Sequence, residues 1–124
     1  MTNDPWPTEI RLKDHGRMLA VSFHDGDAFE LSAEYLRVMS PSAEVQGHSA
    51  AERKTVGGKQ NVAIMQVEPV GNYAVRLIFD DMHSTGIYSW RYLHELGTEH
   101  ETKWAEYLSG LQAKRLSRDR PGLG

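Results

Sequence analysis

The 124-residue sequence contains no cysteine. This absence excludes disulfides, thiolate metal sites and cysteine nucleophiles, and it fits a reducing compartment. A chain of this length can still bury a core without disulfides or metal ions. Its composition, 40% hydrophobic and 25% charged, is typical of a globular protein. We therefore expect one soluble domain that is held together by an ordinary core.

Long apolar runs and extended basic faces are also missing. No apolar run approaches the roughly 20 residues that span a bilayer, and the start, MTNDPWPTEI, lacks the features of a signal peptide. The formal net charge is -3, and basic residues concentrate only toward the far end, from Lys114 to Arg120. Nucleic-acid-binding proteins usually present a basic face. We therefore expect a cytoplasmic protein that binds neither nucleic acid nor a membrane.

The first quarter of the chain has the period-two pattern of β-strands. Residues 8–13, 18–23 and 29–31 alternate apolar and polar side chains, which places one face of a sheet on the core and the other in water. The dipeptide Asp25-Gly26 favours a tight hairpin turn. These segments predict a three-stranded meander. A second hairpin is predicted between 62–69 and 73–79, around the turn PVGN, with a short strand at Ile87-Tyr88.

Three helices are predicted from their start and stop signals. Ser32 caps a short helix that ends before Pro41, because the residue before a proline leaves the helical region. Ser89 caps a second helix, which Gly97 ends after Leu96. The last helix, about 99–115, begins at a Thr98–Glu101 capping box and buries a stripe at i, i+4 and i+7, formed by Trp104, Leu108 and Leu111.

Together these elements predict an α+β, β-rich fold. Antiparallel hairpins form a sandwich or partial barrel, accompanied by short helices and a C-terminal helix. Residues 1–7 are predicted to be a flexible tail, 8–115 a single domain and 116–124 a second flexible tail. Residues 40–61 have no steady period and are predicted to be a long surface loop, a kind of segment that is often functional.

The run VEPVGNYAVRLIFDDMHSTGIYSWRYLHELG, at 67–97, is close to a family pattern that reads approximately IEPVGNYALRLVFDDGHxSGIYSW. With PTEIRL at 7–12 and LSAEYLRVMSPSAEVQGH at 31–48, the chain resembles the DUF971 family, whose domain is similar to the N-terminal domain of gamma-butyrobetaine hydroxylase. The resemblance covers about 7–111. It implies a domain that precedes the oxygenase domain in the hydroxylases, is attached to Mrp-type iron–sulfur-carrier ATPases, and stands alone in many bacteria.

The resemblance also implies a zinc site that this chain has lost. In the hydroxylases a structural zinc is bound by three cysteines of a Cys-Pro-Cys-x-x-Cys-like loop and by one later histidine. The matching positions here are Ser40, Ser42, Val45 and His83. Serine hydroxyls bind zinc poorly beside thiolates, and valine does not bind it. We therefore expect no metal and no cofactor at this site.

His83 is the sharpest candidate for chemistry. With Asp81, and with His48 from the long loop, it offers a weak metal-ligand set. We favour a structural role, in which His83 hydrogen-bonds within its loop and fixes the turn at 40–45. The oxygenase activity does not carry over, because the catalytic domain of the hydroxylases is absent and fold-level analogy is not evidence of activity.

Other catalytic patterns are weak. Gly57-Gly58-Lys59 lacks the first glycine and the Ser or Thr of a phosphate loop. Residue types leave a Ser-His-Asp site open, since Ser84 and Ser89 flank the His83 region, but no Gly-x-Ser-x-Gly elbow is present.

Two functions follow from these features. The first is a non-enzymatic accessory or protein-binding domain whose protein partner is unknown. The family's fusions imply a link to iron–sulfur or oxygenase metabolism, with an iron–sulfur carrier or an oxygenase as the partner. The second is a small-ligand or metal-binding protein centred on His83. The candidate binding surface consists of His48, Asp81, His83, Tyr88 and Tyr92, since tyrosines are enriched at binding hot spots.

Overall fold

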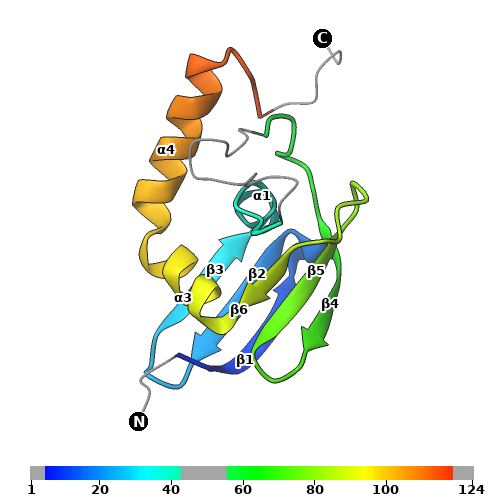
Figure 1. The fold of residues 1–124 in the computed structure, drawn as a ribbon, viewed down its shortest axis with the longest axis vertical. Coiled ribbons are helices and arrows are strands. Elements are labelled where there is room, and N and C mark those ends of the chain that lie inside the picture. Colours follow the sequence, from blue (N-terminus) through cyan, green and yellow to red (C-terminus); the bar gives the residue numbers. More distant parts are fainter. Residues whose placement is uncertain (1–4, 43–55, 119–124) are drawn as a thin grey trace.

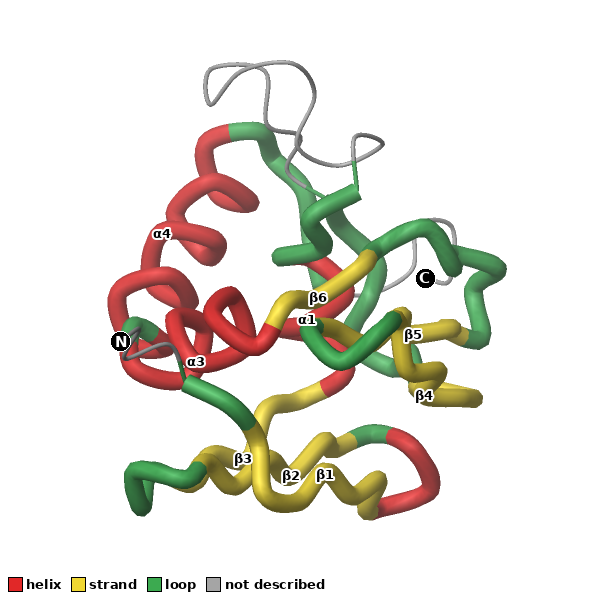
Figure 2. The backbone as a smooth tube through the Cα atoms, turned by 60° about the horizontal axis from the view of Figure 1, so that its bottom comes forward, coloured by secondary structure: helices red, strands yellow, loops and turns green. Residues whose placement is uncertain are grey.

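The structure is a computed structural model that describes residues 5–42 and 56–118. Over these residues the chain forms two three-stranded antiparallel sheets, ordered β1-β2-β3 and β4-β5-β6, with helices α1, α3 and α4. Figure 2 shows the first sheet as a layer on one side, with α1, α3 and the second sheet on the other. The predicted α+β, β-rich fold is confirmed, and the described strands do not close into a barrel.

The first sheet is the predicted meander. It consists of β1 (Pro7–Lys13), β2 (Met18–Phe23) and β3 (Ala28–Ser32), with a 3-10 turn, Asp14–Gly16, between β1 and β2. In β2 the predicted alternation is present along the whole strand, since every second residue from Leu19 is buried. In β1 it is not, because Leu12 is 39% exposed on this edge strand.

The second sheet is the predicted second hairpin with a short third strand. It consists of β4 (Ile64–Val70), β5 (Ala74–Phe79) and β6 (Ile87–Ser89). The two sheets meet at Gly16, where an added Cβ would lie 2.2 Å from the backbone oxygen of Ile64. Gly16 also has φ +87°, so both its backbone and its contact with β4 require glycine.

Serine caps begin two of the helices, as predicted. Ser32 Oγ accepts a hydrogen bond from the Tyr35 amide before α1 (Ala33–Val38), and Ser89 Oγ accepts one from the Tyr92 amide before α3 (Trp90–Thr98). All six residues of α1 are buried, because the helix lies between the strands and α4 (His100–Ala113) (Figure 1). Within the described residues, no helix is long and apolar enough to cross a membrane.

Three predictions about the last two helices are wrong. Gly97 does not end α3, which continues to Thr98; it lies against the Phe29 ring, where a Cβ would come within 2.4 Å. The Thr98 hydroxyl donates to the Glu95 carbonyl instead of forming a capping box, and α4 starts after Glu99 without a side-chain cap. Of the predicted stripe, Leu111 is buried, but Leu108 is 39% exposed, and α4 buries Tyr107 in its place.

Part of each predicted tail is packed against the rest of the chain. The amides of Gly58 and Gln60 donate to the backbone oxygens of Ser117 and Arg118. Arg118 also forms two hydrogen bonds, each 2.7 Å, with the buried carboxylate of Glu34 on α1. Ser117 and Arg118, which lie within the predicted C-terminal tail, are therefore bonded to the rest of the domain. At the other end, Trp6 stacks on the ring of His24.

Candidate functional site

Three of the four residues at the expected zinc positions, Ser40, Ser42 and His83, meet between the end of α1 and the connection from β5 to β6. Ser40 Oγ and His83 Nε2 form a hydrogen bond of 2.9 Å, and the two residues are 0% and 5% exposed. The His83 carbonyl accepts a second bond from the Phe79 amide, at 3.0 Å. His83 therefore links its own connection to Ser40, in the segment after α1; the predicted role in fixing the whole turn at 40–45 stays a prediction, because 43–45 lie outside the described residues.

Ser42 reinforces this link. Its hydroxyl lies 2.7 Å from the Thr85 hydroxyl, and its amide donates to Ser40 Oγ at 3.3 Å. The start of the predicted surface loop, at Ser40 and Ser42, is therefore buried rather than exposed. The remaining expected positions in this loop, Val45 and His48, lie outside the described residues.

The side chains at these positions do not fit a structural zinc ion. Ser40 Oγ and His83 Nε2 bond directly to each other, and Ser42 Oγ is paired with Thr85. A neutral hydroxyl does not supply the thiolate that such a site uses. A hydroxyl–imidazole hydrogen bond here connects the two segments that carry the expected zinc positions.

The same geometry bears on a serine nucleophile. The Ser40–His83 pair is the hydrogen-bonded element of a catalytic dyad, but Ser40 is fully buried. Ser89, considered from the sequence, accepts a hydrogen bond as the cap of α3. The Asp81 carboxylate accepts a hydrogen bond from the His83 amide. Ser40 is thus buried against His83, and Ser89 holds the start of α3.

Asp81 is the centre of a charged network that joins three segments. Its Oδ2 accepts hydrogen bonds from Arg37 Nε at 2.8 Å and from Lys59 Nζ at 2.6 Å, and its Oδ1 accepts from the His83 amide at 3.2 Å. Burial by itself raises the pKa of this carboxyl, but the bonds from Lys59 and Arg37 outweigh it, so the pKa lies below its ordinary value of 3.8. Asp81 is already neutralised and is not a free metal ligand.

Arg37 is a buried cation that this network holds in place. It projects from α1, is 9% exposed, and has a buried Nη1 that makes no hydrogen bond. An unpaired buried donor is costly, so the guanidinium is held mainly through its bond to Asp81. Of the predicted metal set, Asp81 faces Arg37 and Lys59 and His83 faces Ser40, while His48 lies outside the described residues.

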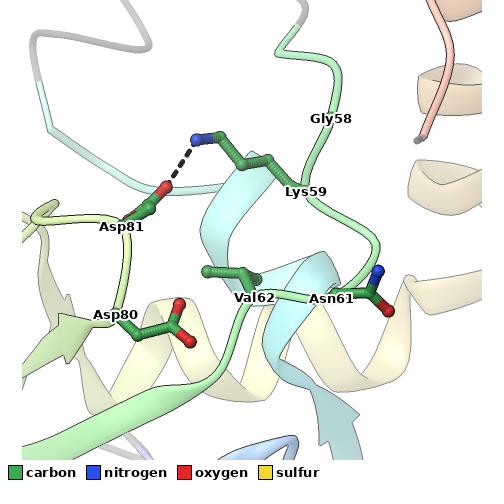
Figure 3. A pocket seen from close by; sticks show the side chains of 6 residues that line it. All are labelled: Gly58, Lys59, Asn61, Val62, Asp80 and Asp81. Atoms are coloured by element: carbon green, nitrogen blue, oxygen red, sulfur yellow. Dashed lines mark hydrogen bonds and ion pairs between the residues drawn. The ribbon is translucent and has the colours of Figure 1, made fainter. Parts of the chain in front are cut away.

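A cavity of about 260 Å³ lies beside this network (Figure 3). Lys59 reaches across toward Asp81, while the neighbouring Asp80 accepts a hydrogen bond from the Ala63 amide at 3.1 Å. The lining residues are Gly58, Lys59, Asn61, Val62, Asp80 and Asp81. Lys59 thus serves Asp81 and not a phosphate, in agreement with the weak phosphate-loop pattern.

Met82 follows directly on this rim and was missed from the sequence. It is 91% exposed, and its φ of +74° lies in the left-handed region, which disfavours residues other than glycine. The signal was present, since the family pattern quoted above has glycine at this position. A large apolar side chain is therefore presented to solvent on a strained turn.

Tyr88 and Tyr92 hold the end of α1. The Tyr88 hydroxyl donates to the Leu36 carbonyl, and the Tyr92 hydroxyl donates to the Met39 carbonyl. These carbonyls are among those that a helix end leaves unpaired. Tyr88 is 0% exposed, and burial raises its pKa. Tyr88 thus lies in the core rather than on the predicted binding surface, and Tyr92 is half-buried.

Comparison with known proteins gives a consistent relationship. The family described as gamma-butyrobetaine hydroxylase-like, N-terminal, matches residues 10–94. Two NMR solution structures, 46% and 43% identical, cover 97% and 94% of this chain and are themselves covered over 89% and 92%; both have TM-scores of 0.82. No match was found among curated proteins.

A crystal structure gives a third similarity. It is a protein of unknown function of the DUF971 family from Acidithiobacillus ferrooxidans ATCC 23270. It is 41% identical, covers 73% of this chain, is itself covered over 90%, and has a TM-score of 0.61.

Proposed function

The chain belongs to the gamma-butyrobetaine hydroxylase-like N-terminal (DUF971) family, and from this premise we propose that it is a non-enzymatic accessory domain that docks on a partner protein. The observation that carries the proposal is the contrast around Asp81. The polar side chains there are bonded to one another, whereas the adjoining Met82 is almost fully exposed.

The closed polar network supports a non-enzymatic role. A catalytic group needs an atom that can reach a substrate. Ser40 and His83 bond to each other beneath the surface, and Asp81 is shared by two cations and an amide. These groups of the candidate site therefore serve to connect the end of α1, the segment before β4, and the β5–β6 connection.

The exposed methionine supports docking. A flexible thioether side chain adapts to an apolar partner surface, and backbone strain is commonly retained where it has a functional use. Lys59, Asp80 and Asp81 line the cavity next to it, so the surface combines one apolar contact with charges of both signs. By family resemblance, we propose a carrier or an oxygenase of iron–sulfur or oxygenase metabolism as the partner.

The test is native mass spectrometry of the tagged protein, gently isolated from its own host. The variants are Met82→Gly and, as a matched control, Met65→Thr, which removes another methionine that is 68% exposed. Glycine suits the left-handed backbone at position 82. The free energy of unfolding of Met82→Gly should therefore equal that of the wild type or exceed it by up to about 1 kcal/mol. We expect the wild type and Met65→Thr to carry the same second protein at a fixed ratio, and Met82→Gly to lose it.

Two results contradict the docking proposal. A bare chain mass from the host means that no stable partner exists under these conditions of isolation. Equal recovery of the partner by Met82→Gly and by the wild type places the contact elsewhere on the domain. Circular dichroism of each variant separates a lost contact from a lost fold.

The cavity beside Asp81 favours one alternative, a small-ligand or metal-binding protein with its site around His83. Under this alternative, native mass spectra contain a reproducible adduct that disappears in His83→Ala. Titration with divalent metals, followed through the histidine ring signals by NMR, distinguishes the two functions. Specific shifts of His83 favour the ligand-binding function, and their absence favours docking.

A further inference from the structure

A second group of ligand-type side chains lies where the turn between β2 and β3 meets α3. It shares no residue with the site around His83. His94 Nε2 lies 2.9 Å from Asp27 Oδ2 and 3.3 Å from Asp25 Oδ2. All three ligand atoms lie within 4.8 Å of one another. Asp25 and Asp27 come from the turn and His94 comes from the helix, 67 positions beyond Asp27.

The imidazole of His94 is aimed by aromatic packing, independently of the aspartates. Its ring stands nearly perpendicular to Phe23, at 85° with ring centroids 4.9 Å apart, and to Phe29, at 86° and 5.7 Å. Both phenylalanines belong to the strands that flank the turn. A histidine whose orientation is fixed by its surroundings loses little freedom when it binds an ion.

The turn also orients the carboxylates. The Asp27 amide donates to Asp25 Oδ1 at 2.9 Å, which leaves Oδ2 of Asp25 directed at His94. Gly26, between them, has φ +94° and allows the tight turn that brings both carboxylates together.

We infer that Asp25, Asp27 and His94 form a surface site for a divalent transition-metal ion of the zinc type. Zinc binds imidazole nitrogen and carboxylate oxygen at about 2.0–2.2 Å, so adjacent ligands around it are roughly 3.0–3.5 Å apart. The distances of 2.9 and 3.3 Å match this spacing. Neutral His94 would bind through Nε2, and any proton on that atom leaves to solvent.

The ligand set also selects among ions. Magnesium and calcium prefer oxygen ligands alone, whereas an imidazole favours zinc and its transition-metal neighbours. The aspartate side chains are 40% and 49% exposed, so water can complete the coordination. An ion bound here would join the β2–β3 turn to α3.

The test is isothermal titration of Zn²⁺ alone into the full chain without a histidine tag, at neutral pH. We expect one Zn²⁺ per chain, with affinity lowered at least about tenfold by Asp27→Asn and by His94→Gln. The matched control is Asp14→Asn with His15→Asn. This control removes an exposed carboxylate and an imidazole. The two residues have φ values of +53° and +57°, which asparagine tolerates. The control should bind Zn²⁺ like the wild type.

NMR of the histidine rings supplies the second measurement. Zn²⁺ should shift the His94 signals, and Mg²⁺ at the same concentration should not. The proposal is overturned by absence of Zn²⁺ uptake, by equal affinity of the wild type and Asp27→Asn, by equal loss in the control, or by a Zn²⁺ shift confined to His83. Asp27 is exposed, so Asp27→Asn keeps the test valid if His94→Gln fails to fold.

Discussion

His83 and His94 both lie beside aspartates, yet their surroundings are opposite. His83 is 5% exposed, its ring bonds to Ser40, and its neighbour Asp81 is paired with Arg37 and Lys59. His94 faces two aspartates at the surface, with no cation in contact with either among the interactions of the described residues. The first cluster uses its polar atoms to hold three segments together, whereas the second leaves carboxylates open to water and to ions.

This difference follows from the cost of burying charge. A charge taken out of water must be paired and hydrogen-bonded, so the buried cluster is closed by necessity. An exposed histidine–aspartate pair contributes little to stability, and a metal ion can replace the proton on the imidazole nitrogen. The same residue types therefore predict a structural role in one place and a ligand-binding role in the other.

The largest effect expected is that of Asp81→Asn. Removing this charge leaves the buried Arg37 and the half-buried Lys59 without a counter-charge, which should lower the free energy of unfolding by about 2–3 kcal/mol. Urea denaturation measures the change. Asp14→Asn, at an exposed position, serves as the control and should differ little from the wild type. A change of similar size in both variants would remove the distinction between the clusters.

The pH dependence sharpens this prediction. The pKa of Asp81 is lowered in the folded chain, so its contribution is fully present above the ordinary value of 3.8 and is lost as pH falls through the lower, folded value. The difference in unfolding free energy between the wild type and Asp81→Asn should therefore be constant near neutral pH and shrink below pH 3.8. A difference that grows with acid contradicts the assignment.

A smaller loss is expected from breaking the Ser40–His83 bond. His83→Ala removes a buried ring and leaves the Ser40 hydroxyl without this partner, so the free energy of unfolding should fall by about 2 kcal/mol. Ser40→Ala tests the same bond from the other side. A double-mutant cycle should give a coupling of about 1 kcal/mol. An unchanged melting temperature in His83→Ala would show that the bond does not stabilise the fold.

Local signals in the sequence predicted the elements well. The alternation of 18–23 and the caps at Ser32 and Ser89 depend on neighbouring residues only, and all are present in the structure. The Thr98–Glu101 box failed because the Thr98 hydroxyl bonds to the Glu95 carbonyl instead, and the helix end at Gly97 failed because a tertiary contact decides it. Gly97, in α3, is needed for its contact with Phe29, which lies in β3.

The sequence predicted only part of the candidate site, because its contacts join residues that are far apart in the chain. The resemblance brought Ser40 and His83 together, although 43 positions separate them. No local pattern pairs Arg37 with Asp81, 44 positions apart, or Asp27 with His94, 67 positions apart. Asp25-Gly26 was noticed only as a turn. The carboxylates became a candidate site when the fold placed a histidine over that turn.

The smallest effect expected is that of Asp27→Asn on stability in metal-free buffer. The Asp27 side chain is 49% exposed, and its contact with His94 is an exposed hydrogen bond. Such pairs contribute little because solvent screens them and both side chains lose freedom. The free energy of unfolding should stay within about 0.5 kcal/mol of the wild-type value.

Urea denaturation with a chelator present measures this change beside that of Asp81→Asn. A loss as large as that of Asp81→Asn would make Asp27 a structural partner of His94 and erase the contrast between the clusters. If Asp27→Asn leaves metal-free stability unchanged but removes the stabilisation that added Zn²⁺ gives the wild type, the open cluster acts through the ion it binds. Stabilisation by a ligand that binds only the folded chain rises with its concentration, so the gap between the two proteins should widen as Zn²⁺ is added.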